Sequence, residues 1–234
     1  MTVKAKLLKY RLRVLNIFFP GSKNFWVKQY EIGDNSGPGS YGDLAKFKSE
    51  VINKFVRDNS ISTVIEFGCG DGNQLGLAEY PEYLGFDVAP GAIKLCTDKF
   101  TNDDSKSFML FDPFYFKTGS LLKADLTISL DVVFHLVEIE QFEIHLIHLF
   151  NTSTKWVIIY GIDEDLFFPE PYTHPRKFTT WISSQIGGWE LDDVVMNRYP
   201  HGSGKTSSMA NFYIYKKILP ANTLYISQDS SIMA

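Results

Sequence analysis

The stretch VIEFGCGDGN, residues 64–73, decides the fold of this chain. It begins with apolar, partly β-branched residues, which predict a short buried strand. Glycines follow at alternate positions, at Gly68, Gly70 and Gly72, where they let the backbone turn sharply and approach a ligand closely. The dinucleotide-binding pattern G-x-G-x-x-G would need a third glycine at position 73, which is Asn73 here. The stretch therefore predicts a strand and a ligand-binding turn that departs from the dinucleotide pattern.

Alternating strands and helices surround this turn. Strands are predicted at 63–68, 82–87, 107–112, 124–131 and 155–161, with two late strands at 189–199 and 210–217, and helices at 43–59, 90–100, 138–150 and 176–186. This order predicts an α/β fold with a mostly parallel sheet that helices cover on both faces. Ligands bind such sheets beyond the carboxyl ends of the strands, which directs attention to the residues that end them.

Composition predicts a soluble globular protein. Of the 234 residues, 44% are apolar and 21% charged, and the formal net charge of −4 disfavours non-specific nucleic-acid binding. Two cysteines form no disulfide framework, so a cytoplasmic location is expected, and no apolar run approaches the roughly 20 residues of a membrane span. Residues 4–21 alternate basic and apolar side chains. They predict an amphipathic helix that packs on its own domain, on a second copy to form a homodimer, or on a membrane surface.

Two carboxylates at predicted strand ends suit an adenosine ligand. Asp87 ends the second strand about twenty residues after Glu66, where an acidic residue accepts hydrogen bonds from ribose hydroxyls. Asp112 ends the third strand and could accept a hydrogen bond from the exocyclic amine of adenine. The alternative for Asp112 is a local cap of the following segment.

These motifs together resemble class I S-adenosylmethionine-dependent methyltransferases. The resemblance covers residues 41–217 and rests on EFGCGDG (66–72), GFD (85–87) and SLDVVFHLVE (129–138). It implies a Rossmann-like seven-stranded sheet whose last strand is antiparallel, preceded by an N-terminal helix and glycine-rich loop (1–40) and followed by a tail (218–234). With NSGPGSYG (35–42), the chain is also similar to methyltransferases that modify surface polysaccharides.

The resemblance also implies a cofactor, S-adenosylmethionine, and the residues that hold it. The methionine end of the cofactor would lie near Glu66 and the glycine loop. Tyr41 would either fold over the cofactor or only anchor the loop to which Tyr41 belongs. The implied cofactor-binding residues are Tyr41, Glu66, Gly68, Cys69, Gly70, Asp87, Val88, Asp112, Pro113, Leu130 and Asp131.

The predicted chemistry is methyl transfer to a small polar acceptor, either a sugar hydroxyl or a phosphorylated or nucleotide-linked glycan precursor. Transfer needs orientation, and a hydroxyl acceptor also needs a base. His135 is the predicted base, with Asp131 orienting it or contacting the amino group of the cofactor; local packing of His135 is the alternative. The other functional readings are a non-catalytic module that binds S-adenosylmethionine, and N-methylation of a small amine.

The predicted acceptor wall consists of Tyr172, His174 and Arg176 after the fifth strand, with Lys205 from the loop between the last two strands. Arg176 could pair with a phosphate or simply begin a helix. Lys205 belongs to GSGKT (202–206), but a P-loop would need glycine at position 199, which is Tyr199. Asp163 or Asp165 with Asp131 could bind Mg²⁺, although a carboxylate run on a loop is usually solvated, so no metal is expected.

Overall fold

The computed structural model describes residues 19–117, 121–203 and 206–218. Its strands are β1 (Thr63–Phe67), β2 (Glu82–Asp87), β3 (Lys106–Leu110), β4 (Ala124–Leu130), β5 (Ser153–Gly161), β6 (Trp189–Val195) and β7 (Asn211–Lys217). Its α-helices are α2 (Ser22–Glu31), α3 (Gly42–Asp58), α4 (Pro90–Lys99), α5 (Ile139–Thr152) and α6 (Phe178–Gln185). The predicted helix at 4–21 lies almost wholly outside the described residues, as do Lys205 and the tail after Ile218.

The seven strands form one sheet in the order β3-β2-β1-β4-β5-β7-β6. β1 pairs in parallel with β2 and β4, and β4 pairs in parallel with β5. β7 lies antiparallel to both β5 and β6. The predicted fold class, a mostly parallel sheet with the last strand reversed, is confirmed.

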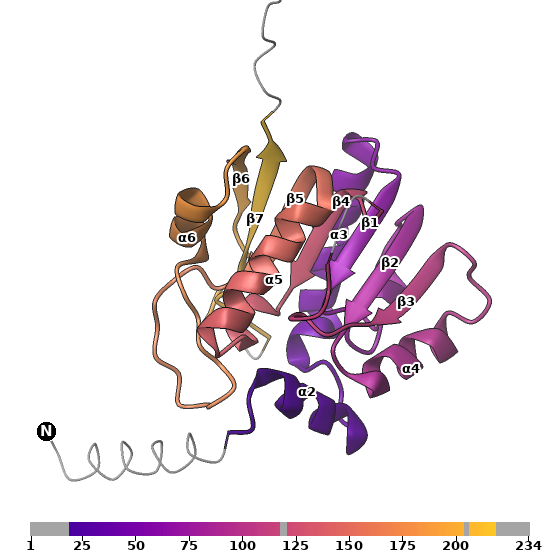
Figure 1. Ribbon diagram of the computed structural model, residues 1–234, viewed down its shortest axis with the longest axis vertical. Coiled ribbons are helices and arrows are strands. Elements are labelled where there is room, and N and C mark those ends of the chain that lie inside the picture. The colour runs from indigo at the N-terminus through magenta and orange to yellow at the C-terminus, as the bar shows by residue number, and fades with distance from the viewer. Residues whose placement is uncertain (1–18, 118–120, 204–205, 219–234) are drawn as a thin grey trace, which may run out of the picture.

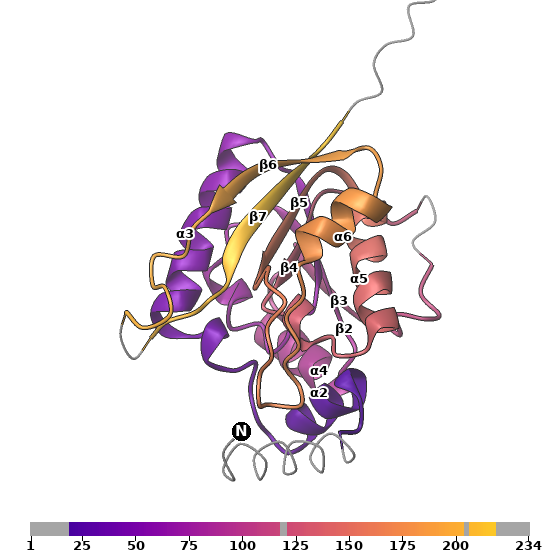
Figure 2. The ribbon, with the colours of Figure 1, turned by 90° about the vertical axis from the view of Figure 1, so that its left-hand side faces the viewer.

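Helices cover both faces of the sheet, as Figure 2 shows with α3 on one side and α5 and α6 on the other. Alternate residues of a strand point to opposite faces. Val64 accordingly packs in a core cluster with Ile52 of α3, while Ile65 packs with Leu146 of α5 in a second cluster. Each face of the central strands is therefore buried, which explains their nearly continuous apolar sequences.

Several strands end earlier than predicted, and the difference bears on the site. Between β1 and β2, where no helix was predicted, the chain forms a 3₁₀ turn, Leu75–Leu77. β3 ends at Leu110, so Asp112 lies beyond the strand, and β4 ends at Leu130, so Asp131 is the first residue outside the sheet.

Helix α2 was not predicted. It begins after Gly21, whose φ of 90° is the left-handed conformation that glycine adopts readily, and it lies across the carboxyl ends of the strands (Figure 1). Its Tyr30 is buried against Ala89 and Ala92 at the start of α4. No helix in the described part of the chain is long and apolar enough to cross a membrane.

Candidate functional site

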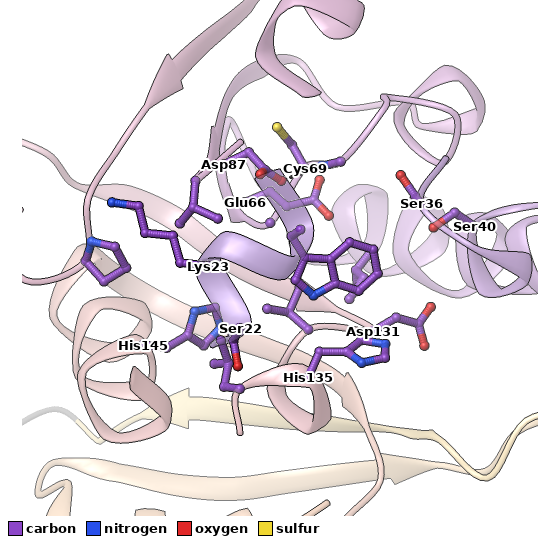
Figure 3. A pocket seen from close by; sticks show the side chains of 18 of the residues that line it. Ser22, Lys23, Ser36, Ser40, Glu66, Cys69, Asp87, Asp131, His135 and His145 are labelled. Atoms are coloured by element: carbon purple, nitrogen blue, oxygen red, sulfur yellow. Dashed lines mark hydrogen bonds between the residues drawn. The ribbon is translucent and has the colours of Figure 1, made fainter. Parts of the chain in front are cut away.

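A pocket opens at the carboxyl ends of the central strands, beneath α2 (Figure 3). Its space is about 930 Å³ including the part open to solvent. The pocket brings together most of the predicted site residues. These are Glu66, Gly68, Cys69, Gly70, Asp87, Val88, Pro113, Leu130, Asp131 and His135.

The glycine loop forms one wall of the pocket, and a side chain at its glycine positions would collide with neighbouring residues. Gly68 has φ 93°, and a Cβ on it would lie 2.4 Å from Val132 Cγ2. Gly70 has φ 59°, and a Cβ on it would lie 2.3 Å from Ser36 Oγ. The loop is also tied to β2, since the Gly68 and Cys69 N–H groups both donate to the Phe86 carbonyl. The backbone is thus held in a tight turn that leaves room for a ligand.

Two buried carboxylates, Glu66 and Asp87, face this wall. Burial raises the pKa of Glu66 to about 7, although a hydrogen bond from the Tyr83 hydroxyl (2.6 Å) opposes the rise. Burial likewise raises the pKa of Asp87 to about 6 against hydrogen bonds from the Ala89 and Gly70 N–H groups. Buried carboxylates with raised pKa values in a pocket are typical of ligand sites, because donors on a ligand would stabilise their charge.

Asp131 is held by a lysine that the sequence analysis missed. Its φ of 59° is unusual for a residue with a side chain, and its Oδ2 accepts a hydrogen bond from Lys48 Nζ at 2.6 Å. The Lys48 side chain is 1% exposed. One signal could have found it: Lys48 falls on the same helix face as Leu44, Phe47, Val51 and Ile52, which is otherwise apolar.

The His135 ring is fixed by a backbone carbonyl. Nδ1 lies 2.8 Å from the Tyr172 carbonyl oxygen. A carbonyl only accepts, so Nδ1 carries the proton and Nε2 keeps a lone pair. Burial lowers the pKa of His135 below the usual histidine value, although the Tyr172 carbonyl and the charge of Asp131 oppose the shift. The residue is therefore neutral near pH 7 and able to accept a proton.

Tyr41 does not line this pocket. Its hydroxyl donates to Asp71 Oδ2 (2.7 Å), which also accepts from the Ser36 N–H (3.0 Å), and Asp71 Oδ1 accepts from the Asn73 N–H (2.9 Å). Burial would raise the pKa of Asp71, but these hydrogen bonds outweigh it and hold the pKa below its usual value. The contact matches the alternative in which Tyr41 anchors its own loop.

Asp112 and the predicted acceptor residues also lie outside the pocket wall. Asp112 pairs with Lys23 of α2 at 2.6 Å. Arg176 donates to the Leu136 and Val137 carbonyls and lies over the Phe142 ring, so it supports the loop after His135. Tyr172 stacks on Phe25, and His174 is exposed while its N–H donates to the Phe134 carbonyl (2.7 Å).

The carboxylates after β5 accept hydrogen bonds from residues at the start of α6. Asp163 accepts from the Thr179 N–H (2.8 Å) and hydroxyl (2.6 Å), and Asp165 accepts from the Lys177 N–H (3.1 Å). They stabilise the first turn of α6, where backbone N–H groups lack helical partners. No group of three potential metal ligands occurs among the residues that the structure describes.

Helix α2 closes the pocket with contacts along its length. Its first residue, Ser22, donates from Oγ to Glu138 Oε2 (2.6 Å) and accepts from the Val137 N–H (2.8 Å). Trp26 lies edge-on to the His135 ring, with ring centroids 5.1 Å apart. The Tyr30 hydroxyl is hydrogen-bonded to Ser36 Oγ at 2.9 Å. The helix that the sequence analysis missed therefore contacts both the glycine-loop side and the His135 side of the site.

Replacing Ser22 with alanine tests this anchor. The change leaves the partly buried Val137 N–H without its partner, which costs about 1–3 kcal/mol. We expect hydrogen exchange of the α2 backbone amides to become about 5- to 100-fold faster, while amides of α3 are unchanged. The matched control is Ser183→Ala on the exposed face of α6. Equal α2 exchange rates in the two variants would contradict the anchor.

Comparison with known proteins adds to this geometry. No protein-family model matches the chain. A segment of 107 residues is 33% identical to the small RNA 2′-O-methyltransferase of Arabidopsis thaliana; the match covers 41% of this chain and 11% of the length of that protein.

Solved structures resemble nearly the whole described fold. The N-methyltransferase NodS from Bradyrhizobium japonicum, in complex with S-adenosylhomocysteine, matches with a TM-score of 0.64 and 14% identity, over 82% of this chain and 98% of that one. Magnesium protoporphyrin IX methyltransferase from Synechocystis, with bound S-adenosylmethionine, matches with a TM-score of 0.60 and 15% identity, over 86% and 99%. The bacterial CtHen1 methyltransferase domain has a TM-score of 0.58 and 15% identity, over 74% and 97%. The chain therefore has the Rossmann-like fold of the S-adenosylmethionine-dependent methyltransferases.

Proposed function

We propose that this chain binds S-adenosylmethionine in the pocket under α2 and transfers its methyl group to a hydroxyl of a small polar acceptor. The residues present suit that cofactor. Asp87 offers a buried carboxylate to ribose hydroxyls, and Val88 and Leu130 offer apolar surface to adenine. The turn at Gly68 brings the backbone close to the ligand, and Glu66 lies beside it.

One observation carries the hydroxyl assignment: the tautomer of His135. Because Nδ1–H donates to the Tyr172 carbonyl, Nε2 is the proton acceptor of a neutral, buried ring that lines the pocket. When bound, S-adenosylmethionine would supply an electrophilic methyl group to the acceptor oxygen. His135 Nε2 takes the proton of the acceptor hydroxyl, and the pocket walls hold the reactants in line.

The first acceptor class is a sugar or a phosphorylated or nucleotide-linked glycan precursor. It is supported by the motif resemblance at residues 35–42, 66–75 and 129–138 and by the net charge of −4, which does not favour a polyanion. Tyr172 and His174 remain proposed acceptor contacts, because they follow β5 at the carboxyl edge of the sheet. Lys205, which lies outside the described residues, is proposed from the sequence alone.

The second acceptor class is a ribose 2′-hydroxyl of small RNA. It is favoured by the 33% identity to a small RNA 2′-O-methyltransferase over 107 residues. The same base would serve both classes, since each acceptor loses a hydroxyl proton. Small amines form a third class that needs no strong base once the amine is neutral.

An acceptor screen separates these classes. The protein is incubated with S-adenosylmethionine and, in turn, with nucleotide sugars, phosphorylated sugars, short RNA duplexes and small amines. Release of S-adenosylhomocysteine and a mass gain of one methyl group are measured together. Methylation of a sugar or of RNA at oxygen supports the proposal and selects the class. Methylation of amines alone contradicts the hydroxyl assignment, and cofactor binding without turnover on any acceptor would indicate a binding module.

A further inference from the structure

The inward face of helix α2 carries three residues that are one helical turn apart. Ser22, Trp26 and Tyr30 are spaced by four positions, so their side chains lie on one side of the helix, and all three line the pocket. Ser22 is 1% exposed and donates to Glu138, and Tyr30 is 8% exposed. The Tyr30 hydroxyl is bonded to Ser36. Trp26, between them, is only partly buried. Protein contacts therefore occupy both ends of this face, and its middle presents an indole ring to the pocket.

The indole of Trp26 borders the proposed base. The ring centroids of Trp26 and His135 are 5.1 Å apart, with their planes at 71°. His135 Nδ1 is taken up by the Tyr172 carbonyl, so Nε2 is the nitrogen left for an acceptor hydroxyl. The oxygen of a hydroxyl that gives its proton to Nε2 comes within roughly 3 Å of that nitrogen. An acceptor large enough to carry several hydroxyls therefore reaches the indole as well.

The Trp26 side chain combines a fixed position with an unused hydrogen-bond donor. It packs against the buried side chains of Tyr30 and Ala89, which hold the ring in place. No described residue accepts a hydrogen bond from Trp26 Nε1, whereas Trp181 Nε1 donates to Glu143 Oε1 at 3.1 Å. A tryptophan N–H that is removed from water usually finds a partner. Trp26 therefore offers a ligand an apolar ring surface and an N–H donor side by side.

A sugar ring complements these two features. One face of a pyranose presents C–H groups, which pack favourably on an apolar surface, while hydroxyl groups project from the edge of the ring. A sugar that lies on the indole can therefore direct one hydroxyl toward His135 and place another near Trp26 Nε1. A small amine would also contact an aromatic ring, through a cation–π interaction, but it brings no hydroxyl to His135.

We infer that Trp26 is the acceptor platform: the ring of a sugar packs against its indole and turns one hydroxyl toward His135 Nε2. This inference rests on the proposed function, because it requires His135 to act on a hydroxyl. It goes further in naming the surface that binds the acceptor. It also selects a sugar ring from among the acceptor classes.

Saturation-transfer NMR tests the platform in the unmodified protein. The protein is first saturated with S-adenosylhomocysteine. It then receives in turn the methyl glycosides of glucose, galactose and mannose, uridine as a fragment of RNA, and tetramethylammonium as a fragment of an amine. With the aromatic protons of the protein irradiated, we expect transfer to the ring C–H protons of at least one glycoside, stronger on one face of the sugar than on the other. Transfer only to uridine, only to tetramethylammonium or to none of the probes would overturn the inference.

Three variants assign the transfer to one side chain. Trp26→Leu should lower the transfer to the glycoside at least about threefold, whereas Trp26→Phe, which keeps an aromatic face, should retain most of it. Both variants should bind S-adenosylhomocysteine within about threefold of the unmodified protein, which also shows that the pocket is folded. The matched control is Trp189→Leu at the start of β6, where the ring packs edge-on to Phe150 at the far end of the sheet. A loss of S-adenosylhomocysteine affinity in Trp26→Leu and Trp26→Phe, with unchanged transfer, would assign the indole to the cofactor and overturn the platform.

Steady-state kinetics with a sugar acceptor separate binding from support of the base. Trp26→Leu should raise KM for the acceptor about 3- to 10-fold and leave kcat within about threefold, and Trp26→Phe should raise KM less. A fall in kcat with an unchanged KM would show that Trp26 only positions His135, which contradicts the platform. If the unmodified protein does not bind S-adenosylhomocysteine, the proposed function itself fails. That result differs from binding the cofactor product but none of the glycosides, which overturns the platform alone.

Discussion

Replacing His135 with alanine is expected to lower kcat for a hydroxyl acceptor by about 10²- to 10⁴-fold. The ring lines the pocket in a neutral state, and its Nε2 keeps a free lone pair. Affinity for S-adenosylhomocysteine should change by no more than about threefold, because removing one side chain contact without a charged hydrogen bond costs well under 1 kcal/mol. Single-turnover rates and equilibrium titration separate the two effects.

The pH profile gives the same variant a sharper test. A base acts only when unprotonated, and burial lowers the pKa of His135 below its ordinary 6.5. The rate of the unmodified protein should therefore be constant near pH 7 and should fall only at pH values below 6.5. In His135→Ala this fall should disappear, and added imidazole should restore part of the rate. A variant that keeps full activity across the pH range would show that His135 only packs locally.

Replacing Gly68 with alanine is expected to have the second large effect, a loss of affinity for the cofactor. A Cβ at this position would lie 2.4 Å from Val132 Cγ2, and the φ of 93° is one that a residue with a side chain rarely adopts. Backbone strain of this kind costs about 1–3 kcal/mol, and relief of the clash would push the turn into the pocket. We expect S-adenosylhomocysteine to bind about 10- to 100-fold more weakly, measured by isothermal titration.

Gly187 offers a matched control for this change. It lies between α6 and β6, and a Cβ on it would meet nothing within 4 Å. Gly187→Ala should leave both ligand affinity and thermal stability almost unchanged. If Gly68→Ala binds the ligand as tightly as Gly187→Ala does, then the turn after β1 is not the part of the pocket that contacts the cofactor.

One segment, residues 131–138, connects the parts of the site. Asp131 pairs with Lys48 of α3, His135 contacts the Tyr172 carbonyl after β5, and Glu138 holds the first residue of α2. These contacts join three elements that are far apart in the chain. Substitutions at either end of the segment are therefore expected to affect His135 through its position, even where they touch neither reactant.

Much of the site was predictable because its determinants are local. Glycine tolerates positive φ wherever it stands, so three alternate glycines after an apolar run indicate a tight turn in any fold. Parallel strands end at the same sheet edge, so Glu66, Asp87 and Asp131 could be expected to meet once the strands were recognised. The structure brings all three into one pocket.

Other features were decided only by tertiary structure. Lys48 and Asp131 are 83 residues apart, Ser22 and Val137 are 115 apart, and Lys23 and Asp112 are 89 apart. His135 is oriented by a backbone carbonyl, a group that every residue carries and that no sequence pattern marks. Arg176, predicted as an acceptor contact, likewise donates to two backbone carbonyls that no sequence pattern marks.

The sequence by itself determined the order of strands and helices, the glycine turn and the carboxylates at the strand ends, because short-range backbone preferences and apolar periodicity encode them. Tertiary structure alone decided which cation meets Asp131, which nitrogen of His135 is free and which helix closes the pocket. Those outcomes depend on contacts between segments that only the packed sheet and its covering helices bring within hydrogen-bond distance.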